Sequence, residues 1–159
     1  MRPDGIAHTA FALGALGLGG WGLWNPKGTE LHRLIGMLYV LSLFSVNAIA
    51  LTIYRGDGSF GVFHLLAIVN LAILLVGFGA AFLRRPRGAW LPYHYYFMGW
   101  SYVGLCAAAG AEIGVRLPGV SLALGAGIPT IVVTIVGGSW VHLRSRATLD
   151  RVKHARGAA

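Results

Sequence analysis

The chain has 159 residues, of which 56% are hydrophobic and only 11% are charged. A water-soluble domain of this size does not need so much apolar surface, so the composition excludes an ordinary soluble protein and indicates an integral membrane protein. The net charge of +8 would suggest a nucleic-acid partner in a soluble protein. In a membrane protein the distribution of the charge matters more than its sum, and we expect no nucleic-acid binding.

Five apolar segments, separated by short polar turns, predict five membrane-spanning helices. Each is long enough to cross a hydrocarbon core of roughly 30 Å at about 1.5 Å per residue. The predicted helices cover residues 6–24, 31–54, 60–83, 92–116 and 120–142. We therefore expect an all-α membrane protein in which residues 1–142 form a single transmembrane domain. Four helices would make an up-down core with the fifth helix peripheral to it, and residues 143–159 would form a basic tail.

Small residues at four-residue spacing predict where helices approach each other closely. They occur at Ala15 and Gly19, at Gly110 and Gly114, and at Gly119, Ala123 and Gly127. Two polar side chains inside the apolar segments, Asn47 and Asn70, are expected to hydrogen-bond between helices.

The basic residues predict the orientation of the chain in the membrane. One side would carry ten of them: Lys27, Arg33, Arg84, Arg85, Arg87, Arg144, Arg146, Arg151, Lys153 and Arg156. The other side would carry three: Arg2, Arg55 and Arg116. Because short cytoplasmic loops are rich in Lys and Arg, we expect a multi-pass protein of the bacterial inner (cytoplasmic) membrane, with its N-terminus outside and its tail in the cytoplasm. We interpret the basic tail as part of the charge signal that keeps this end of the chain in the cytoplasm. The second interpretation is contact between the tail and anionic lipid headgroups.

Four of the six histidines fall near the start of a predicted helix: His8, His32, His64 and His94. Since successive helices run in opposite directions, His8 and His64 would lie near the outer face, and His32 and His94 near the cytoplasmic face. Helices two apart in sequence sit diagonally across a four-helix core, so each pair is able to supply both axial ligands of a b-type haem. A single histidine at a helix end is more often an interfacial residue, but four in this pattern favour two haems.

This pattern predicts a dihaem membrane cytochrome that passes electrons across the bilayer, between a quinol and a partner protein on one face. A competing interpretation starts from Glu112, which would share the outer face with His8 and His64. Two histidines and a carboxylate form a facial triad for zinc or non-haem iron in a metal-dependent membrane enzyme. A similar cluster on the inner side would contain Glu30, His32, His94 and His142.

The simplest interpretation of Glu112 is an ion pair with Arg116, four residues further along the same helix. A further alternative for the whole chain is a non-catalytic accessory subunit of a larger membrane complex, or a homo-oligomer.

Two tracts carry a resemblance to known families. Residues 27–36 (KGTELHRLIG) followed by Tyr39, and residues 94–102 (HYYFMGWSY), resemble an uncharacterised family of predicted bacterial membrane proteins. The layout of the histidines is also similar to that of the transmembrane dihaem cytochrome b family of ascorbate-linked and ferric reductases. By that similarity, His8 with His64 and His32 with His94 would be the axial ligands of two b haems.

Overall fold

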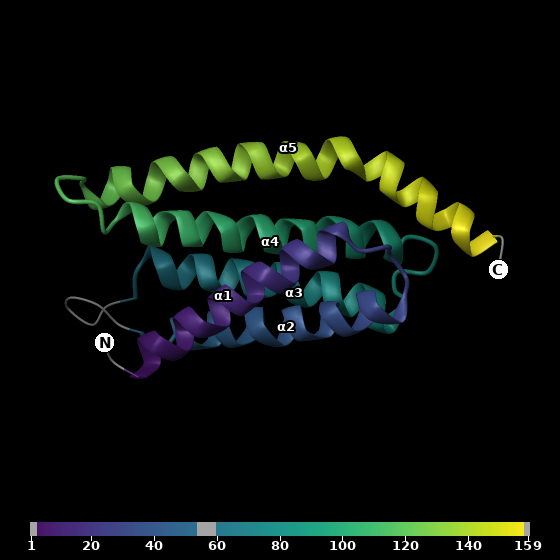
Figure 1. Cartoon of the computed structure of the whole chain (residues 1–159), viewed down its shortest axis with the longest axis horizontal. Coiled ribbons are helices and arrows are strands. Elements are labelled where there is room, and N and C mark those ends of the chain that lie inside the picture. The colour runs from purple at the N-terminus through teal and green to yellow at the C-terminus, as the bar shows by residue number, and fades with distance from the viewer. Residues whose placement is uncertain (1–2, 54–59, 158–159) are drawn as a thin grey trace. The chain divides into compact units, whose positions relative to one another are not determined.

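The computed structural model of the chain describes residues 3–53 and 60–157, with side chains up to residue 152. Within these ranges the chain forms five helices and no strand, so the predicted all-helical class is confirmed. The helices are α1 (Pro3–Trp24), α2 (Glu30–Ala50), α3 (Val62–Leu83), α4 (Trp90–Gly114) and α5 (Leu122–Gly157), as Figure 1 shows. The predicted end of the second helix at Tyr54, and the turn that follows it, lie outside the described residues.

The largest difference from the predicted boundaries is at the end of α5. The apolar pattern ends near His142, but the helix continues to Gly157. No glycine or proline interrupts residues 143–156, so nothing in the local sequence breaks the helix there. Residues 143–157 of the predicted basic tail are therefore a helical continuation of the fifth apolar segment.

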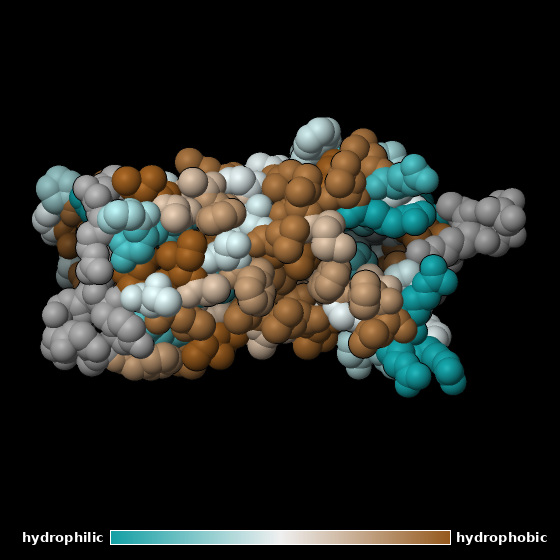
Figure 2. All heavy atoms as spheres, turned by 90° about the horizontal axis from the view of Figure 1, so that it is seen from below, coloured by the Kyte–Doolittle hydropathy of each residue, from teal (hydrophilic) through white to brown (hydrophobic). Residues whose placement is uncertain are grey.

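Four of the helices in residues 3–53 and 60–157 are long and apolar enough to cross a membrane. They are α1, α2, α3 and, over Leu122–Val152, α5. Many of their large hydrophobic side chains are exposed, including Leu41, Ile131 and Ile135, and Figure 2 shows hydrophobic residues over much of the displayed face. Such helices fit a lipid bilayer, and the chain is a multi-pass membrane protein by this criterion.

The helix α4 is not one of the four, although it has 25 residues. Its first half is rich in tyrosine and tryptophan and carries His94, which lowers its mean hydropathy. The span predicted at residues 92–116, and the arrangement of a four-helix core with a peripheral fifth helix, stay predictions.

The chain divides into two compact units, Met1–Leu75 and Val76–Ala159, with the boundary inside α3. In the first unit, α1 packs along α2. The face of α2 with buried side chains repeats every three or four residues, at Ile35, Tyr39, Leu43 and Val46. On α1 the buried residues are Ala15 and Gly19, as the small-residue spacing predicted.

In the second unit, α4 packs along α5 so closely that the two backbones touch. A Cβ atom on Gly114 would overlap the carbonyl oxygen of Gly125, and one on Gly125 would lie 2.7 Å from that of Gly114. A Cβ on Gly110 would lie 3.1 Å from Pro129 Cβ, so the predicted close approach at Gly110 and Gly114 is confirmed.

The same prediction is wrong for Gly119, Ala123 and Gly127. A Cβ on Gly127 would meet nothing within 4 Å, and Ala123 is exposed. The reason is that α5 begins only at Leu122, so Gly119 belongs to the preceding turn with a φ of +77° and shares no helix face with the other two. The glycine that meets α4 is Gly125.

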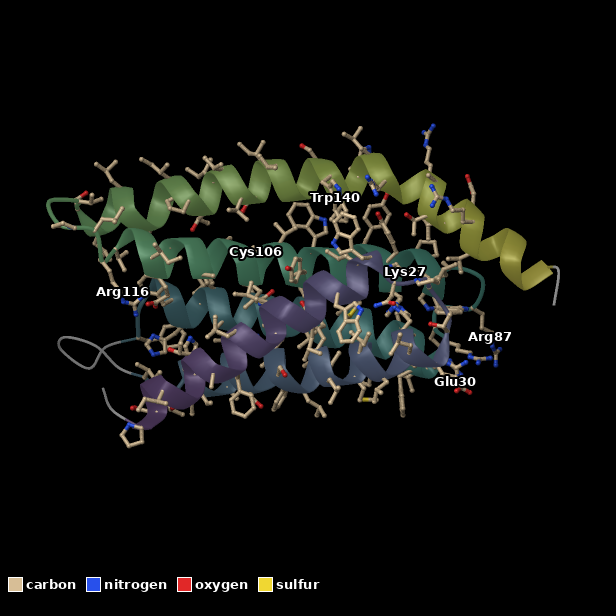
Figure 3. All side chains as sticks on the ribbon, viewed as in Figure 1. Lys27, Glu30, Arg87, Cys106, Arg116 and Trp140 are labelled. Atoms are coloured by element: carbon tan, nitrogen blue, oxygen red, sulfur yellow. The ribbon has the colours of Figure 1, made fainter. Side chains whose placement is uncertain are left out.

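Side chains close the turn between α1 and α2, where Figure 3 labels Lys27. The Lys27 ammonium donates to the carbonyls of Gly22 (2.5 Å) and Leu23 (3.0 Å), which are among the last carbonyls of α1. Burial lowers the pKa of Lys27. The hydroxyl of Thr29 accepts from the His32 N–H at 3.1 Å and so caps the start of α2.

Candidate functional site

The three histidines of the first unit lie on three helices: His8 on α1, His32 on α2 and His64 on α3. His8 is partly buried, and its Nδ1 atom is buried with no hydrogen-bond partner among the residues that the structure describes. His32 is also partly buried, in the first turn of α2. His64 is the most buried of the three, with 6% of its surface exposed.

The ring of His64 is bonded within its own helix turn. Gly61 precedes the first residue of α3, and its N–H donates to His64 Nδ1 at 3.1 Å. The first N–H groups of a helix have no intrahelical partner, so the ring takes the place that Glu or Gln occupies in a capping box. It also stacks on Phe60, with the ring centroids 5.0 Å apart. Because Nδ1 accepts this bond, the proton of the neutral ring lies on Nε2.

The ring of His94, on α4, is bonded to a different helix. Its Nδ1 atom lies 3.0 Å from the carbonyl oxygen of Gly77 on α3. A carbonyl oxygen only accepts hydrogen bonds, so His94 Nδ1 carries the proton and donates it. In the neutral ring the lone pair therefore lies on Nε2. A bond from Nδ1–H to a backbone carbonyl is the usual way in which a metal-ligating histidine is oriented.

Gly77 permits this contact because it has no side chain. A Cβ atom on Gly77 would lie 2.9 Å from both the Met98 nitrogen and Phe97 Cβ of α4, closer than Cβ atoms approach other atoms. The close approach brings the Gly77 carbonyl within reach of His94, one turn before Met98. Sequence reasoning missed Gly77. The only signal was a glycine in an apolar helix, and Gly79, two residues later, gives the same signal although a Cβ there would meet nothing within 4 Å.

The helix that carries His94 is also fixed to α5. The Tyr95 hydroxyl donates to the Val141 carbonyl at 3.0 Å. One turn further along α4, a Cβ on Gly99 would lie 3.1 Å from the Val141 side chain. Neighbours on both sides therefore restrict the rotation of α4 and the direction of the His94 ring.

Glu112 pairs with Arg116 at the end of α4, where Figure 3 labels the arginine. An Arg116 nitrogen lies 2.7 Å from the Glu112 carboxylate, and another bonds the Glu112 carbonyl. The ion-pair interpretation of Glu112 is confirmed. In the part of the chain that the structure describes, no group of three or more His, Cys, Asp or Glu side chains is placed to hold a metal ion. The two predicted non-haem clusters thus receive no support from the structure.

One of the two asparagines differs from expectation. The side-chain amide of Asn47 donates to the Leu43 carbonyl at 2.8 Å, within α2. The predicted bond between helices is wrong for Asn47, because a carbonyl one turn back on its own helix is already within reach. The Oδ1 atom of Asn70 is buried and has no hydrogen-bond partner among the described residues, and the bond between helices stays a prediction for this residue.

The candidate residues divide between the two units, with His8, His32 and His64 in the first and His94, Glu112 and the exposed His142 in the second. The pairings of His8 with His64 and of His32 with His94 stay predictions from the sequence layout.

The chain matches no protein-family model, no curated protein and no solved structure. The two family resemblances therefore stay predictions, and the function has to be argued from the residues themselves.

Proposed function

We propose that the chain is a b-type cytochrome of the bacterial inner membrane that binds haem through His94 and passes electrons across the bilayer. It would exchange electrons with a quinol and with a partner protein on one face of the membrane. When bound, haem iron supplies reversible one-electron chemistry, and the protein supplies the axial ligands and their orientation. The observation that carries the proposal is the hydrogen bond from His94 Nδ1 to the Gly77 carbonyl.

This hydrogen bond supports the proposal because it fixes the form of the ring that iron needs. Imidazole binds iron through a nitrogen lone pair, and the bond to Gly77 leaves that lone pair on Nε2 of the neutral ring. The close contact at Gly77 on one side and the Tyr95 bond to α5 on the other hold the ring in a defined direction. Such rigid support is what an axial ligand requires.

The other three histidines support the proposal to different degrees. The sequence layout pairs His32 with His94, and His8 with His64 in a second haem. The buried Nδ1 of His8 has no hydrogen-bond partner within the described ranges 3–53 and 60–157, and a ligand would satisfy it. His64 supports a second haem least, because its Nδ1 accepts from Gly61 and its proton therefore lies on Nε2. Iron binding through that Nε2 would require the Gly61 bond to break and the proton to move.

The test is the visible absorption spectrum of the detergent-purified chain from haem-replete cells, oxidised and dithionite-reduced, with a pyridine haemochrome assay for stoichiometry. We expect a sharp Soret band, with separate α and β bands on reduction. A colourless protein would contradict the proposal, and metal analysis would then test the zinc or non-haem iron alternative.

A matched pair of variants assigns the ligand. His94→Ala should abolish the haem bound at this site, whereas His142→Ala should leave the haem content unchanged, because His142 is exposed on α5. If the His94→Ala protein has the same haem content as the natural chain, His94 is not a haem ligand, even though the chain binds haem.

A further inference from the structure

The helix α5 is longer than a membrane crossing requires, and its C-terminal part extends out of the hydrocarbon core. At about 1.5 Å per residue, its 36 residues span roughly 54 Å, against a hydrocarbon core of roughly 30 Å. Arginines begin at Arg144, directly after the apolar stretch that ends near Val141. Residues 143–152, here called the α5 extension, therefore fall at and beyond the headgroup layer of one leaflet.

One side of the α5 extension is packed and cannot turn outward. Val141 and Ser145 are 2% and 3% exposed, and the Tyr95 hydroxyl of α4 bonds the Val141 carbonyl. Thr148, Leu149 and Val152 continue this side as partly buried residues. Packing against α4 thus fixes the rotation of α5 about its axis. It thereby decides which side chains of α5 are left exposed.

A basic face made of Trp140, Arg144 and Arg151 flanks this packed side of α5. These residues are four and seven apart, so they share one face of the helix, and all three are exposed. The Arg144 guanidinium lies over the Trp140 ring, 5.5 Å from its centroid. The acidic residue of the extension, Asp150, points about 100° away from Arg151.

We propose that Trp140, Arg144 and Arg151 bind the phosphate of anionic phospholipids in the leaflet where α5 leaves the membrane. Guanidinium groups bind phosphate oxygens in pairs of hydrogen bonds, and their positive charge complements an anionic headgroup. A tryptophan at this level keeps its apolar ring in the acyl boundary and its N–H in the headgroup layer. The contact of the Arg144 guanidinium with the Trp140 ring favours this position of the arginine before lipid binds.

Native mass spectrometry of the full-length chain in detergent, titrated with phosphatidylglycerol or phosphatidylcholine of the same acyl chains, tests this proposal. We expect phosphatidylglycerol to bind more tightly, and each of Arg144→Gln and Arg151→Gln to weaken it by about fivefold. The double variant should approach the affinity for phosphatidylcholine. Arg146→Gln is the matched control, because Arg146 is exposed on the opposite side of the same turn.

Three outcomes would overturn the proposal. The first is equal affinity of the natural chain for the two lipids, and the second is a loss in Arg146→Gln as large as in Arg144→Gln. The third is displacement of the lipid by millimolar inorganic phosphate, which would indicate a site for free phosphate instead of a lipid headgroup. The replaced side chains are exposed, so each variant should elute as the natural chain does in size-exclusion chromatography. The haem content of the chain has no part in this test.

Discussion

His64 and His94 occupy similar places in the sequence, each within the first two turns of an apolar helix, but their rings are bonded in opposite ways. His64 Nδ1 accepts a hydrogen bond from Gly61, three residues earlier in the same turn. His94 Nδ1 donates one to Gly77, 17 residues earlier on another helix. The proton of the neutral ring therefore lies on Nε2 in His64 and on Nδ1 in His94.

The difference shows that a repeated pattern of histidines can contain two separate roles. A ring that accepts from its own helix start works as a cap and stabilises that helix. A ring that donates to a neighbouring carbonyl joins two helices and presents Nε2 in the form that binds iron. Four histidines at four helix starts therefore do not have to be four equivalent ligands.

The largest effect that separates the two residues should be on haem content. His94→Ala should lose the haem of its site completely, because Ala offers no ligand to iron. His64→Ala should retain the haem at His94, as measured by the pyridine haemochrome assay on both proteins. Loss of all haem in both variants would contradict the separation of roles, and so would loss in neither.

The next effect concerns the contact that places His94. Gly77→Ala puts a methyl group 2.9 Å from the Met98 nitrogen, and overpacking against a backbone costs about 1–3 kcal/mol. Gly79→Ala is the control on the same helix, because its methyl group meets nothing within 4 Å and Ala is the better helix former. Thermal unfolding in detergent, followed by circular dichroism, should give a clearly lower midpoint for Gly77→Ala only. Equal midpoints would mean that α3 and α4 do not approach each other at Gly77.

A smaller effect tests the cap at His64. His64→Ala removes the acceptor for the Gly61 N–H and should destabilise the protein by about 1 kcal/mol. His64→Gln should recover most of this loss, because a Gln at the same position of a capping box accepts the same bond. Both midpoints come from the same unfolding experiment, and a Gln variant as unstable as the Ala variant would argue against a capping role.

An effect of similar size is expected for the bond between His94 and Gly77 taken alone. The Gly77 carbonyl has two lone pairs and lies inside α3, so loss of the His94 donor should cost only about 0.5–1.5 kcal/mol. His94→Gln keeps a side-chain N–H donor and should be more stable than His94→Ala. Without an imidazole, however, it should be as deficient in haem as the Ala variant. A Gln variant with normal haem would contradict ligation by His94.

The features that were predictable from the sequence depend on neighbours along the chain. The helices follow from apolar runs between turn residues, and the Glu112–Arg116 pair follows from four-residue spacing. Each involves residues within one turn of helix, so no knowledge of the fold is needed.

The features that were not predictable depend on how each helix is rotated against its neighbour. Gly77 and Gly79 look alike in the sequence, and only the approach of α4 distinguishes them. Gly125 meets Gly114, whereas the better-spaced Gly127 meets nothing within 4 Å. The proton position on each of the His64 and His94 rings follows from the hydrogen-bond partner of its Nδ1 atom. For His94 this partner lies on another helix.

The proton positions on His64 and His94 are tested most directly by ¹⁵N nuclear magnetic resonance of the histidine rings, with the ¹⁵N-histidine-labelled chain reconstituted in lipid bilayers without added haem. Signals are assigned by His64→Gln and His94→Gln, and the pH is held where the rings are neutral. We predict a protonated Nδ1 for His94 and a protonated Nε2 for His64, opposite ring forms that would separate the two roles. The same tautomer at both positions, or the two tautomers exchanged, would contradict this prediction.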